Sequence, residues 1–574
     1  MATSTEGQDH LNGHSGFILA VFCVVSVFVI WPVKLPLAPV FQRPLLRLFQ
    51  KSRIIGDQDF KDLSNRKLYF SLSLLTAPLI GVILLLATTT INGSTIRLGI
   101  VGDETIKPYD VLVLFISLAY IAIALDGTGA LEAVAFYVSK RGGSSGRLLF
   151  TYLYGFFLLT ACLVGNDPLI LSGTPFLAYL TYHTGLEPSA WVFSEFMAAN
   201  TASAVLVSSN PTNILITGSF GLNFLTGFTK WTILPSLIPA ALNYPVILAM
   251  FWNRIPKTLT PVTEDPWSKL RDRIGAIFLS TLLLVTVAVL VGTSFVPAHA
   301  VEVWMVTAPA GVLGFLWDLG SDWFRPKQKE QNVLRRQSMD QTAEMQRLDR
   351  TGSNRSQPVP VQPSQLEKVS TTPDSNRSPE GKSSKPHSRT TLLSLLRQFA
   401  RRFPSTSRTI QRLPIPLLPF AMCEFILVRG LAQRGWISVF ASGFANACTT
   451  PASTVFFMGF VSAAFLCPLA GTNIGATIIL VEILRDSKFS QSEAVLRDER
   501  VLLGAIYAVA MGSNIGAFSY TFAGSLAGLL WRGLLADKGI HISQLRFALV
   551  NAIPLLMQIT VSSAIILGEL YWFV

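Results

Sequence analysis

Charged side chains are scarce in this chain. Only 14% of its 574 residues are Asp, Glu, Lys or Arg, whereas about a quarter of the residues of an average soluble protein are charged. Half of the residues are hydrophobic, and several apolar runs approach or exceed the roughly 18–20 residues that a helix needs to cross a bilayer. These features exclude an ordinary soluble domain and predict an all-α polytopic membrane protein.

The spacings that mark metal sites, disulfide frameworks and catalytic centres are also missing. The five cysteines include no CxxC pair, the six histidines form no HExxH motif, and Gly381-Lys382-Ser383 lacks the earlier glycine of a phosphate loop. We therefore predict no metal, no cofactor and no enzymatic activity. Each cysteine is expected to be a small buried hydrophobe, although Cys162 and Cys467 lie near two polar motifs where a thiophilic solute could meet them.

The positive charge of the chain is concentrated in one segment. The net charge is +12, and residues 318–412 supply +9 of it with 18 Lys and Arg against 9 Asp and Glu. This segment is rich in Ser, Pro and Gln, buries little apolar surface and is expected to be disordered. It is either a solvated tether between two membrane halves or a segment regulated by phosphorylation or lipid. We predict no nucleic-acid partner.

Apolar runs divide the rest of the chain into ten expected spans and two interrupted stretches. Each interrupted stretch, 147–184 and 452–484, is a candidate spanning pair or a re-entrant hairpin, and ten spans remain if both are hairpins. With residues 1–16 outside, the cytoplasmic loops are net positive and the outer loops neutral, as the positive-inside rule requires. We expect a multi-pass protein of the plasma membrane rather than of an organelle membrane. The expected spans are 17–35, 69–91, 109–126, 190–228, 231–252, 274–295, 300–317, 413–432, 501–532 and 547–570.

Two parts of the chain have the same order of features. A polar hairpin tip, a later Ser-Asn break and a final span occur first with Gly165-Asn166-Asp167 and Ser209-Asn210, and again with Gly471-Thr472-Asn473 and Ser513-Asn514. The predicted topology inserts the first hairpin from the cytoplasm and the second from outside, so the repeats are inverted, as in many secondary transporters.

This repeat gives five predicted segments. They are an N-terminal span with a basic cytoplasmic loop (1–68), the first transport repeat (69–252), a connecting loop and spans of which 300–317 opens the second repeat (253–317), the basic loop (318–412) and the remainder of the second repeat (413–574).

Helix breaks at membrane depth are costly unless protein or trapped water satisfies the freed backbone groups. Half-helix N-termini then favour an anion or an oxygen-rich neutral solute, and Asn, Ser and Thr complete a cup of hydrogen-bonding groups. The predicted substrate- and ion-binding residues are Asn166, Asp167, Ser209, Asn210, Thr212, Asn213, Thr472, Asn473, Ser513 and Asn514.

Asp167 is the acidic residue among them. Burial would let it exchange a proton or pair with a cation, and it could also simply cap the returning half-helix. The second tip has Asn473 in place of an acid. The other ionisable residues near the spans are expected to be structural or to reach the interface, and Glu195 and Glu424 in particular could be interfacial. These other residues are Asp126, Glu195, Glu424, Arg429 and Glu482.

At these motifs the sequence resembles the ion transporter superfamily, and within it most closely the arsenite/antimonite exporters of the ArsB type. The resemblance covers about residues 69–317 and 413–572 and is carried by "VGNDPLILSGTPF", "ANTASAVLVSSNPTN" and "GSNIGAFSYTFAGSLAGLLWRGLLADKGIHIS". It implies inverted repeats, a homodimer and an elevator-like shift of the substrate. Carboxylate carriers of the superfamily show Ser-Asn-Thr at the hairpin tips, and this chain does not.

The resulting expectation is a secondary transporter in the lipid bilayer that exports arsenite or antimonite, driven by protons or membrane potential. The alternative within the superfamily is a sodium/proton antiporter or a citrate/dicarboxylate carrier. In either case the partner is a small inorganic or organic ion.

Overall fold

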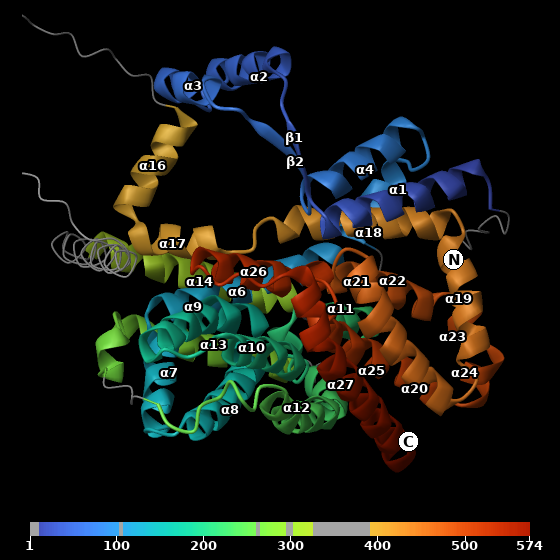
Figure 1. Ribbon diagram of the computed structural model, residues 1–574. Helices are drawn as coiled ribbons and strands as arrows, with labels where there is room; N and C mark the ends of the chain where they lie inside the picture. The colour runs from blue at the N-terminus through green and yellow to red at the C-terminus, as the bar shows by residue number, and fades with distance from the viewer. Residues whose placement is uncertain (1–10, 103–106, 260–263, 294–301, 325–390) are drawn as a thin grey trace, which may run out of the picture. The chain divides into compact units, whose positions relative to one another are not determined.

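The computed structural model describes residues 11–102, 107–259, 264–293, 302–324 and 391–574, and these are mostly helical (Figure 1). The strands in this part of the chain are β1 (Val33–Pro36) and β2 (Tyr69–Leu72), which pair antiparallel with Val33 opposite Leu72. The prediction of an all-α membrane protein is confirmed.

The chain forms two compact units. Unit 1 comprises residues 1–39, 67–318 and 405–574, and unit 2 comprises residues 40–66 and 319–404. Unit 2 contains most of α2 (Pro39–Lys51), α3 (Asp57–Ser64) and α16 (Leu392–Arg402). Arg397 of α16 pairs with Asp59 of α3 at 2.9 Å, and this hydrogen bond lowers the pKa of the Asp59 carboxyl.

Ten helical segments of the described chain are long and apolar enough to cross a membrane. Kinks or short interruptions divide some of these segments into shorter α-helices. The ten are α1 (Gly13–Ile30), α6 (Pro108–Gly127), α8 (Gly146–Val164), Phe224–Met250 with α12 (Lys230–Met250), α13 (Arg273–Thr293), α14 (Val303–Phe324), Pro404–Gln433 with α17 (Pro404–Arg412) and α18 (Leu417–Gln433), Pro451–Leu469 with α20 (Pro451–Phe460) and α21 (Cys467–Leu469), Arg500–Phe518 with α25 (Arg500–Ile515), and α27 (Gln544–Phe573).

Eight of these ten coincide with spans expected from the sequence, and two do not. The expected span 69–91 is wrong, because β2 occupies its start and its helix, α4 (Thr76–Ala87), has only 12 residues. The expected span 190–228 is broken into shorter helices. Their places among the ten are taken by Gly146–Val164 and Pro451–Leu469, the first arms of the two interrupted stretches.

The ends of the basic loop are helical rather than disordered. α14 continues to Phe324, and residues 392–412 form α16 and α17. Arg, Leu and Phe alternate there with helical periodicity, which the loop's overall composition concealed. The central part of the expected disordered loop, 325–390, lies outside the described residues.

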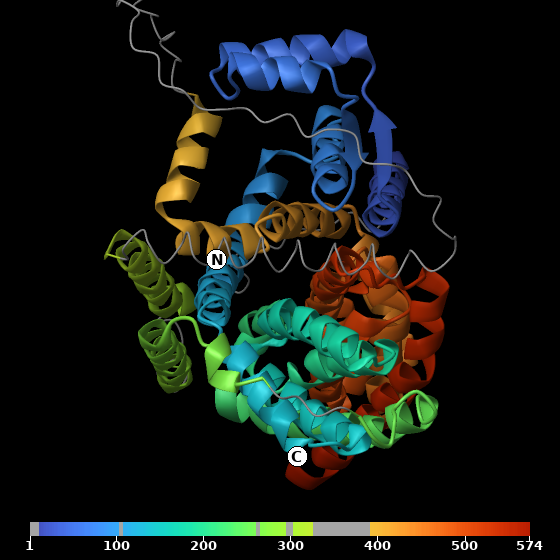
Figure 2. The same cartoon turned by 60° about the vertical axis from the view of Figure 1, so that its left-hand side comes forward.

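The remaining helices of unit 1 are not among these ten segments. They are α5 (Gly93–Val101), α7 (Ala130–Arg141), α9 (Asn166–Thr184), α10 (Ser189–Ala202), α11 (Pro211–Ser219), α19 (Trp436–Ala447), α22 (Asn473–Arg485), α23 (Ser487–Ser490), α24 (Glu493–Arg497) and α26 (Leu526–Asp537). In Figure 2 the teal helices of the first repeat lie beside the red C-terminal helices, in agreement with the packing of α10 and α12 on α25.

An aromatic cluster fixes the broken helices around the centre of unit 1. The Trp531 ring of α26 is fully buried and stacks on Phe196 of α10 at 4.8 Å, while Phe547 of α27 lies 4.2 Å from Phe522. Each such pair contributes about 0.5–1.5 kcal/mol beyond the burial of its area. The cluster therefore joins α10 to α26 and α27, which come from distant parts of the chain.

Candidate substrate and ion site

The first hairpin tip is a glycine turn between two helices. α8 ends at Val164, Gly165 has φ +99°, and α9 begins at Asn166. A Cβ atom on residue 165 would lie 2.8 Å from the Ser209 carbonyl oxygen, so this close approach requires glycine. The Asn166 amide Nδ2 donates to Oδ1 of Asn200 at 3.1 Å, and its Oδ1 accepts the Asp167 backbone N–H at 2.9 Å.

The first break lies between α10 and α11. The backbone leaves the α-helix after Ala202, passes through a 3-10 turn at Val207–Ser209, and enters α11 with Asn210 as its N-cap. Asn210 Oδ1 accepts from both the backbone N–H and the hydroxyl of Thr212. Asn213 Nδ2 donates to the carbonyls of Ser203 and Leu206, which lie within the break.

The second tip repeats this plan with different residues. Gly471 has φ +84°, and Thr472 caps α22 by accepting the Gly475 backbone N–H at its hydroxyl oxygen. The amide Nδ2 of Asn473, the first residue of α22, donates to the Ser513 carbonyl at 3.2 Å. The Ser513 hydroxyl in turn bonds the hydroxyl of Thr477 at 2.7 Å.

The second break lies later than the sequence suggested. Ser513 and Asn514 belong to the last turn of α25, and the irregular segment runs from Gly516 to Ser525, the N-cap of α26. The Nδ2 of Asn514 donates to the Ala510 carbonyl one turn earlier, at 2.9 Å, so the side chain has a partner within its own helix.

Asn514 joins the two halves of the chain. Its Oδ1 accepts from Asn210 Nδ2 at 2.9 Å and from the Ser203 hydroxyl at 3.2 Å, and its Nδ2 donates to Asn213 Oδ1 at 2.7 Å. Asn514 and Asn213 are fully buried, and Asn210 is 2% exposed. We call the connected residues the asparagine cluster: Asn166, Asn200, Ser203, Asn210, Asn213, Asn473, Ser513 and Asn514.

Asn200 is the cluster member that sequence reasoning missed. It lies in the last turn of α10, as Asn514 lies in the last turn of α25, while Asn210 and Ser525 both cap the following helix. Asn200 is therefore the positional counterpart of Asn514. In the sequence, Asn200 appears as an asparagine among the small residues of "ANTAS", residues 199–203, and this was the available signal.

Two predicted site residues lie at the edge of this cluster. The Asp167 carboxylate is partly exposed and has no hydrogen-bond partner among the described residues. The Ser209 hydroxyl donates to the Cys162 carbonyl at 2.9 Å, which fastens the first break to the end of α8. The structure thus brings the predicted residues together, and their role in binding stays a prediction.

The electrostatic character of the site follows from three helix ends. α9, α11 and α22 begin at or beside cluster residues, so their N-terminal N–H groups and partial positive charges face it. The cluster side chains are all uncharged amides and hydroxyls. An apolar crevice lined by Pro211, Ile474 and Phe115, among others, borders the first turns of α11 and α22. Such a site suits a neutral polar solute or a small anion.

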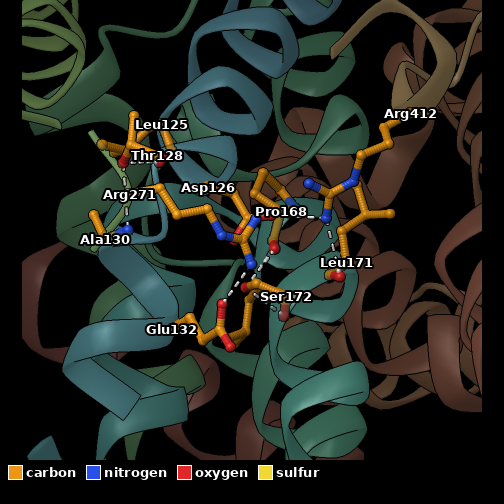
Figure 3. A network of polar contacts seen from close by, with 11 residues as sticks. Leu125, Asp126, Thr128, Ala130, Glu132, Pro168, Leu171, Ser172, Arg271 and Arg412 are labelled. Atoms are coloured by element: carbon orange, nitrogen blue, oxygen red, sulfur yellow. Dashed lines mark hydrogen bonds and ion pairs between the residues drawn. The ribbon is translucent and has the colours of Figure 1, made fainter. Parts of the chain in front are cut away.

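A charged network braces α9 a little beyond its tip. Arg412 of α17 pairs with the Asp126 carboxylate at 2.7 Å and donates to the Leu171 carbonyl at 3.2 Å. Figure 3 shows Asp126 and Leu171 beside Ser172 of α9. It also shows the ion pair between Arg271 and the Glu132 carboxylate, at 3.1 Å. These contacts agree with the expectation that Asp126 has a structural role. Arg412 binds both Asp126 at the end of α6 and Leu171 of α9, and so holds the two helices together.

Of the two roles expected for Glu195 and Glu424, structural or interfacial, their burial excludes the interfacial one. Their exposed fractions are 0% and 1%, because Glu195 packs in the middle of unit 1 and Glu424 packs against α22. Glu195 accepts a hydrogen bond from the Thr174 hydroxyl at 2.9 Å. Arg429 pairs with Glu482 at 3.5 Å rather than with Glu424 on its own helix.

Broken helices that meet in a buried polar cluster within a multi-span helical protein define a membrane transporter. A family model described as citrate transporter matches residues 65–496. The chain belongs to this family, and it is accordingly an integral multi-pass transporter of the plasma membrane in the ion transporter superfamily.

Relatives with named functions are similar over a shorter stretch. Two arsenical pump membrane proteins of Escherichia coli are 33% and 32% identical over 181 residues, and a transporter of Mycobacterium tuberculosis described as uncharacterised is 25% identical over 175 residues. These matches cover 30%, 30% and 29% of this chain, and 41%, 41% and 39% of the relatives. The chain therefore spans about two fifths of the length of the curated relatives it matches.

A solved structure, that of the YdaH transporter of Alcanivorax borkumensis, aligns with a TM-score of 0.48 at 11% identity and covers 98% of this chain and 99% of that one.

Proposed function

We propose that this protein is a secondary transporter that exports arsenite and antimonite, driven by proton exchange or by the membrane potential. The observation that carries this proposal is the uncharged asparagine cluster, which offers amide and hydroxyl groups to a solute without any fixed positive side chain. Arsenite is small and largely uncharged at neutral pH, so a cup of hydrogen-bonding groups can hold it. The similarity to arsenical pump membrane proteins supports the same substrate class.

In this proposal a substrate exchanges hydrogen bonds with the cluster. Asn210, Asn213 and Asn514 bond one another directly, so a hydroxylated solute has to replace some of these bonds as it enters. Replacing one bond by another costs little net free energy, which favours binding that is reversible enough for release.

Asp167 is the proposed coupling group. It is the first-turn acid of α9, lies next to Asn166, and its carboxylate has no hydrogen-bond partner among the described residues. Its proton would be bound in one orientation of the carrier and released in the other.

The proposed cycle uses two inverted repeats that share the cluster. Asn200 and Asn514, Asn210 and Ser525, and the two glycine tips occupy matching places, which supports a common plan for both halves. We propose an elevator-like movement of this unit within a homodimer.

A carrier of citrate or another carboxylate, or a sodium/proton antiporter, is the alternative. The family description favours a carboxylate, and the N-termini of α9, α11 and α22 could receive one.

Growth of a sensitive strain on arsenite, antimonite, high sodium or citrate, with and without this protein, tests the proposal. Resistance to arsenite and antimonite that is lost in D167N, with the variant still present in the membrane, is the expected result. Growth on citrate or sodium tolerance without arsenite resistance would favour the alternative.

A further inference from the structure

A line of polar side chains runs along α27, the helix that ends the chain. Asn551, Gln558, Ser562 and Glu569 are spaced by 7, 4 and 7 residues. At about 100° per residue these four positions fall within roughly 40° of one another around the helix axis. Their exposed fractions are 0%, 0%, 0% and 6%, so the line faces protein rather than lipid. We call these four residues the α27 polar line.

The line is long enough to matter for transport. Residues 551 and 569 are separated by 18 positions, or about 27 Å at 1.5 Å per residue, close to the thickness of the hydrocarbon core of a bilayer. The helix packs along α12, α25 and α20, as Figure 1 shows for the adjacent α25 and α27. The length of this polar line is therefore comparable with the thickness of the hydrocarbon core.

Most polar side-chain atoms of the line have no protein partner among the described residues. Among the described residues no hydrogen bond reaches either amide atom of Asn551, Nδ2 or Oδ1, nor Gln558 Nε2, the Ser562 hydroxyl or either carboxylate oxygen of Glu569. Polar side chains that only hold helices together would bond across the interface. A buried polar group without such a bond costs about 1–3 kcal/mol unless water satisfies it. Several of them in one line indicate a chain of water molecules.

The line meets the asparagine cluster at its middle. Gln558 Oε1 accepts from the Thr201 hydroxyl at 2.6 Å, and Thr201 directly follows Asn200 in the last turn of α10. The Ser236 hydroxyl of α12 donates to the Thr201 carbonyl at 2.6 Å. Gln558 is therefore the point of contact between the α27 polar line and the cluster.

Glu569 is the titratable member of the line. Lys230 at the start of α12 and Tyr507 of α25 are the ionisable groups that act on it from the helices packed against α27. Arg500, at the start of α25, lies over the ring of Tyr571, and α20 contributes no ionisable side chain.

We infer that the α27 polar line holds water and conducts protons between Glu569 and the asparagine cluster. A proton leaves the Glu569 carboxyl group, which becomes a carboxylate, and passes along waters bonded to Ser562 and Gln558. It reaches Thr201 and the hairpin tip, where the Asp167 carboxylate accepts it, and Glu569 takes up a new proton from water at its own end of α27. The link to Asp167 rests on the proposed proton coupling, whereas the hydration of the line does not.

The hydration is tested without any substrate by infrared spectroscopy of the full-length protein in nanodiscs. The band of the protonated Glu569 carboxyl group is assigned by its loss in E569Q, and its shift is followed after a change from H2O to D2O. We expect exchange to slow at least about tenfold in S562L and Q558L, which corresponds to about 1.4 kcal/mol in the barrier. T560V, on an exposed face of the same helix, keeps the wild-type rate. Equal rates in all four proteins would overturn the inference.

Proteoliposomes separate this inference from the proposed function. With arsenite as substrate, we expect E569Q and S562A to retain exchange of internal for external substrate and to lose uptake driven by a pH gradient. Loss of both activities in S562A, a variant that removes only one hydroxyl, would assign Ser562 to substrate handling and contradict the proton path. Absence of arsenite transport by the wild type would refute the proposed substrate and leave the infrared result to decide on the path.

Discussion

Asn210 and Asn514 are 304 positions apart in the chain, and the amide Nδ2 of the first donates to Oδ1 of the second at 2.9 Å. Both side chains are buried, and each belongs to a helix end beside a break. The contact shows that the two broken helices meet. Each buried amide side chain supplies a hydrogen-bond partner to the other. Without Asn514, the buried Nδ2 of Asn210 would lose the acceptor that it has in the other half of the chain.

N514A is predicted to reduce transport at least about tenfold, because it removes the residue that joins both halves. It leaves Asn210 and Asn213 without their shared partner, so the free energy of unfolding should fall by about 2–4 kcal/mol. Substrate uptake into vesicles, normalised to the amount of inserted protein, measures the first effect, and unfolding in detergent measures the second.

A double-mutant cycle with N210A distinguishes a direct contact from two independent effects. We expect a coupling free energy of about 1 kcal/mol or more between positions 210 and 514. N65A, at the exposed asparagine that directly follows α3, is the control and should change neither uptake nor stability. Additive effects of N210A and N514A would show that the contact is energetically unimportant.

G165A is predicted to disrupt the first hairpin tip. Gly165 combines φ +99° and ψ 169°, a region open almost only to glycine, and a Cβ atom there would lie 2.8 Å from the Ser209 carbonyl oxygen. We expect a loss of stability of about 2–3 kcal/mol and loss of transport in vesicles. G185A is the matched control: its φ is +68°, but no atom lies within 4 Å of an added Cβ, so it should cost only about 1 kcal/mol and leave transport intact. Equal effects of the two variants would show that the approach to Ser209 is unimportant.

The sequence was a good guide to the parts of the fold that depend on composition and local motif. Apolar length identified eight of the ten candidate spans, and the polar tips at Asn166 and Asn473 were predicted at the residues where α9 and α22 begin. Gly165 and Gly471, which precede the two tips, are needed for a local reason, because the backbone there has a positive φ. Such a turn can be predicted without knowing which distant segment packs against it.

The parts that failed depend on partners distant in the chain. Asn514 was assigned to the break because asparagine is a poor helix former, yet its bonds to Asn210 and Asn213 keep it satisfied within α25. Asn200 was overlooked because nothing near it in the sequence shows that Asn166 reaches it. Glu195 was expected to be either structural or interfacial, and the sequence could not decide because the packing of Gly173 against it is not visible there.

R412A is predicted to loosen α9 from the end of α6. It leaves Asp126, whose side chain is 7% exposed, without its ion-pair partner, and the Leu171 carbonyl without a donor. A fully buried pair costs about 3–5 kcal/mol to break; since the Arg412 side chain is 27% exposed, we expect about 2 kcal/mol. Denaturant unfolding of the purified protein measures this difference. R401A, on the exposed face of α16, should have no effect, and an equal loss in both variants would contradict the role of the Asp126 pair.

E302Q is predicted to lower stability at neutral pH and to lose this effect in acid. Glu302, just before α14, pairs with Lys107, just before α6, and this hydrogen bond lowers the pKa of the Glu302 carboxyl below its ordinary 4.5 and raises the pKa of Lys107.

Because the folded-state pKa of Glu302 is depressed, its contribution is complete above about pH 4.5 and is lost as pH falls through the folded value. The side chains are 24% and 31% exposed, so the difference should stay below about 1 kcal/mol. Thermal unfolding of wild type and E302Q from neutral to acidic pH measures it. E493Q, which breaks an exposed pair with Arg497, is the control and should follow the wild type throughout. A stability difference between E302Q and wild type that persisted at the acidic end would show that the charge of Glu302 is not its source.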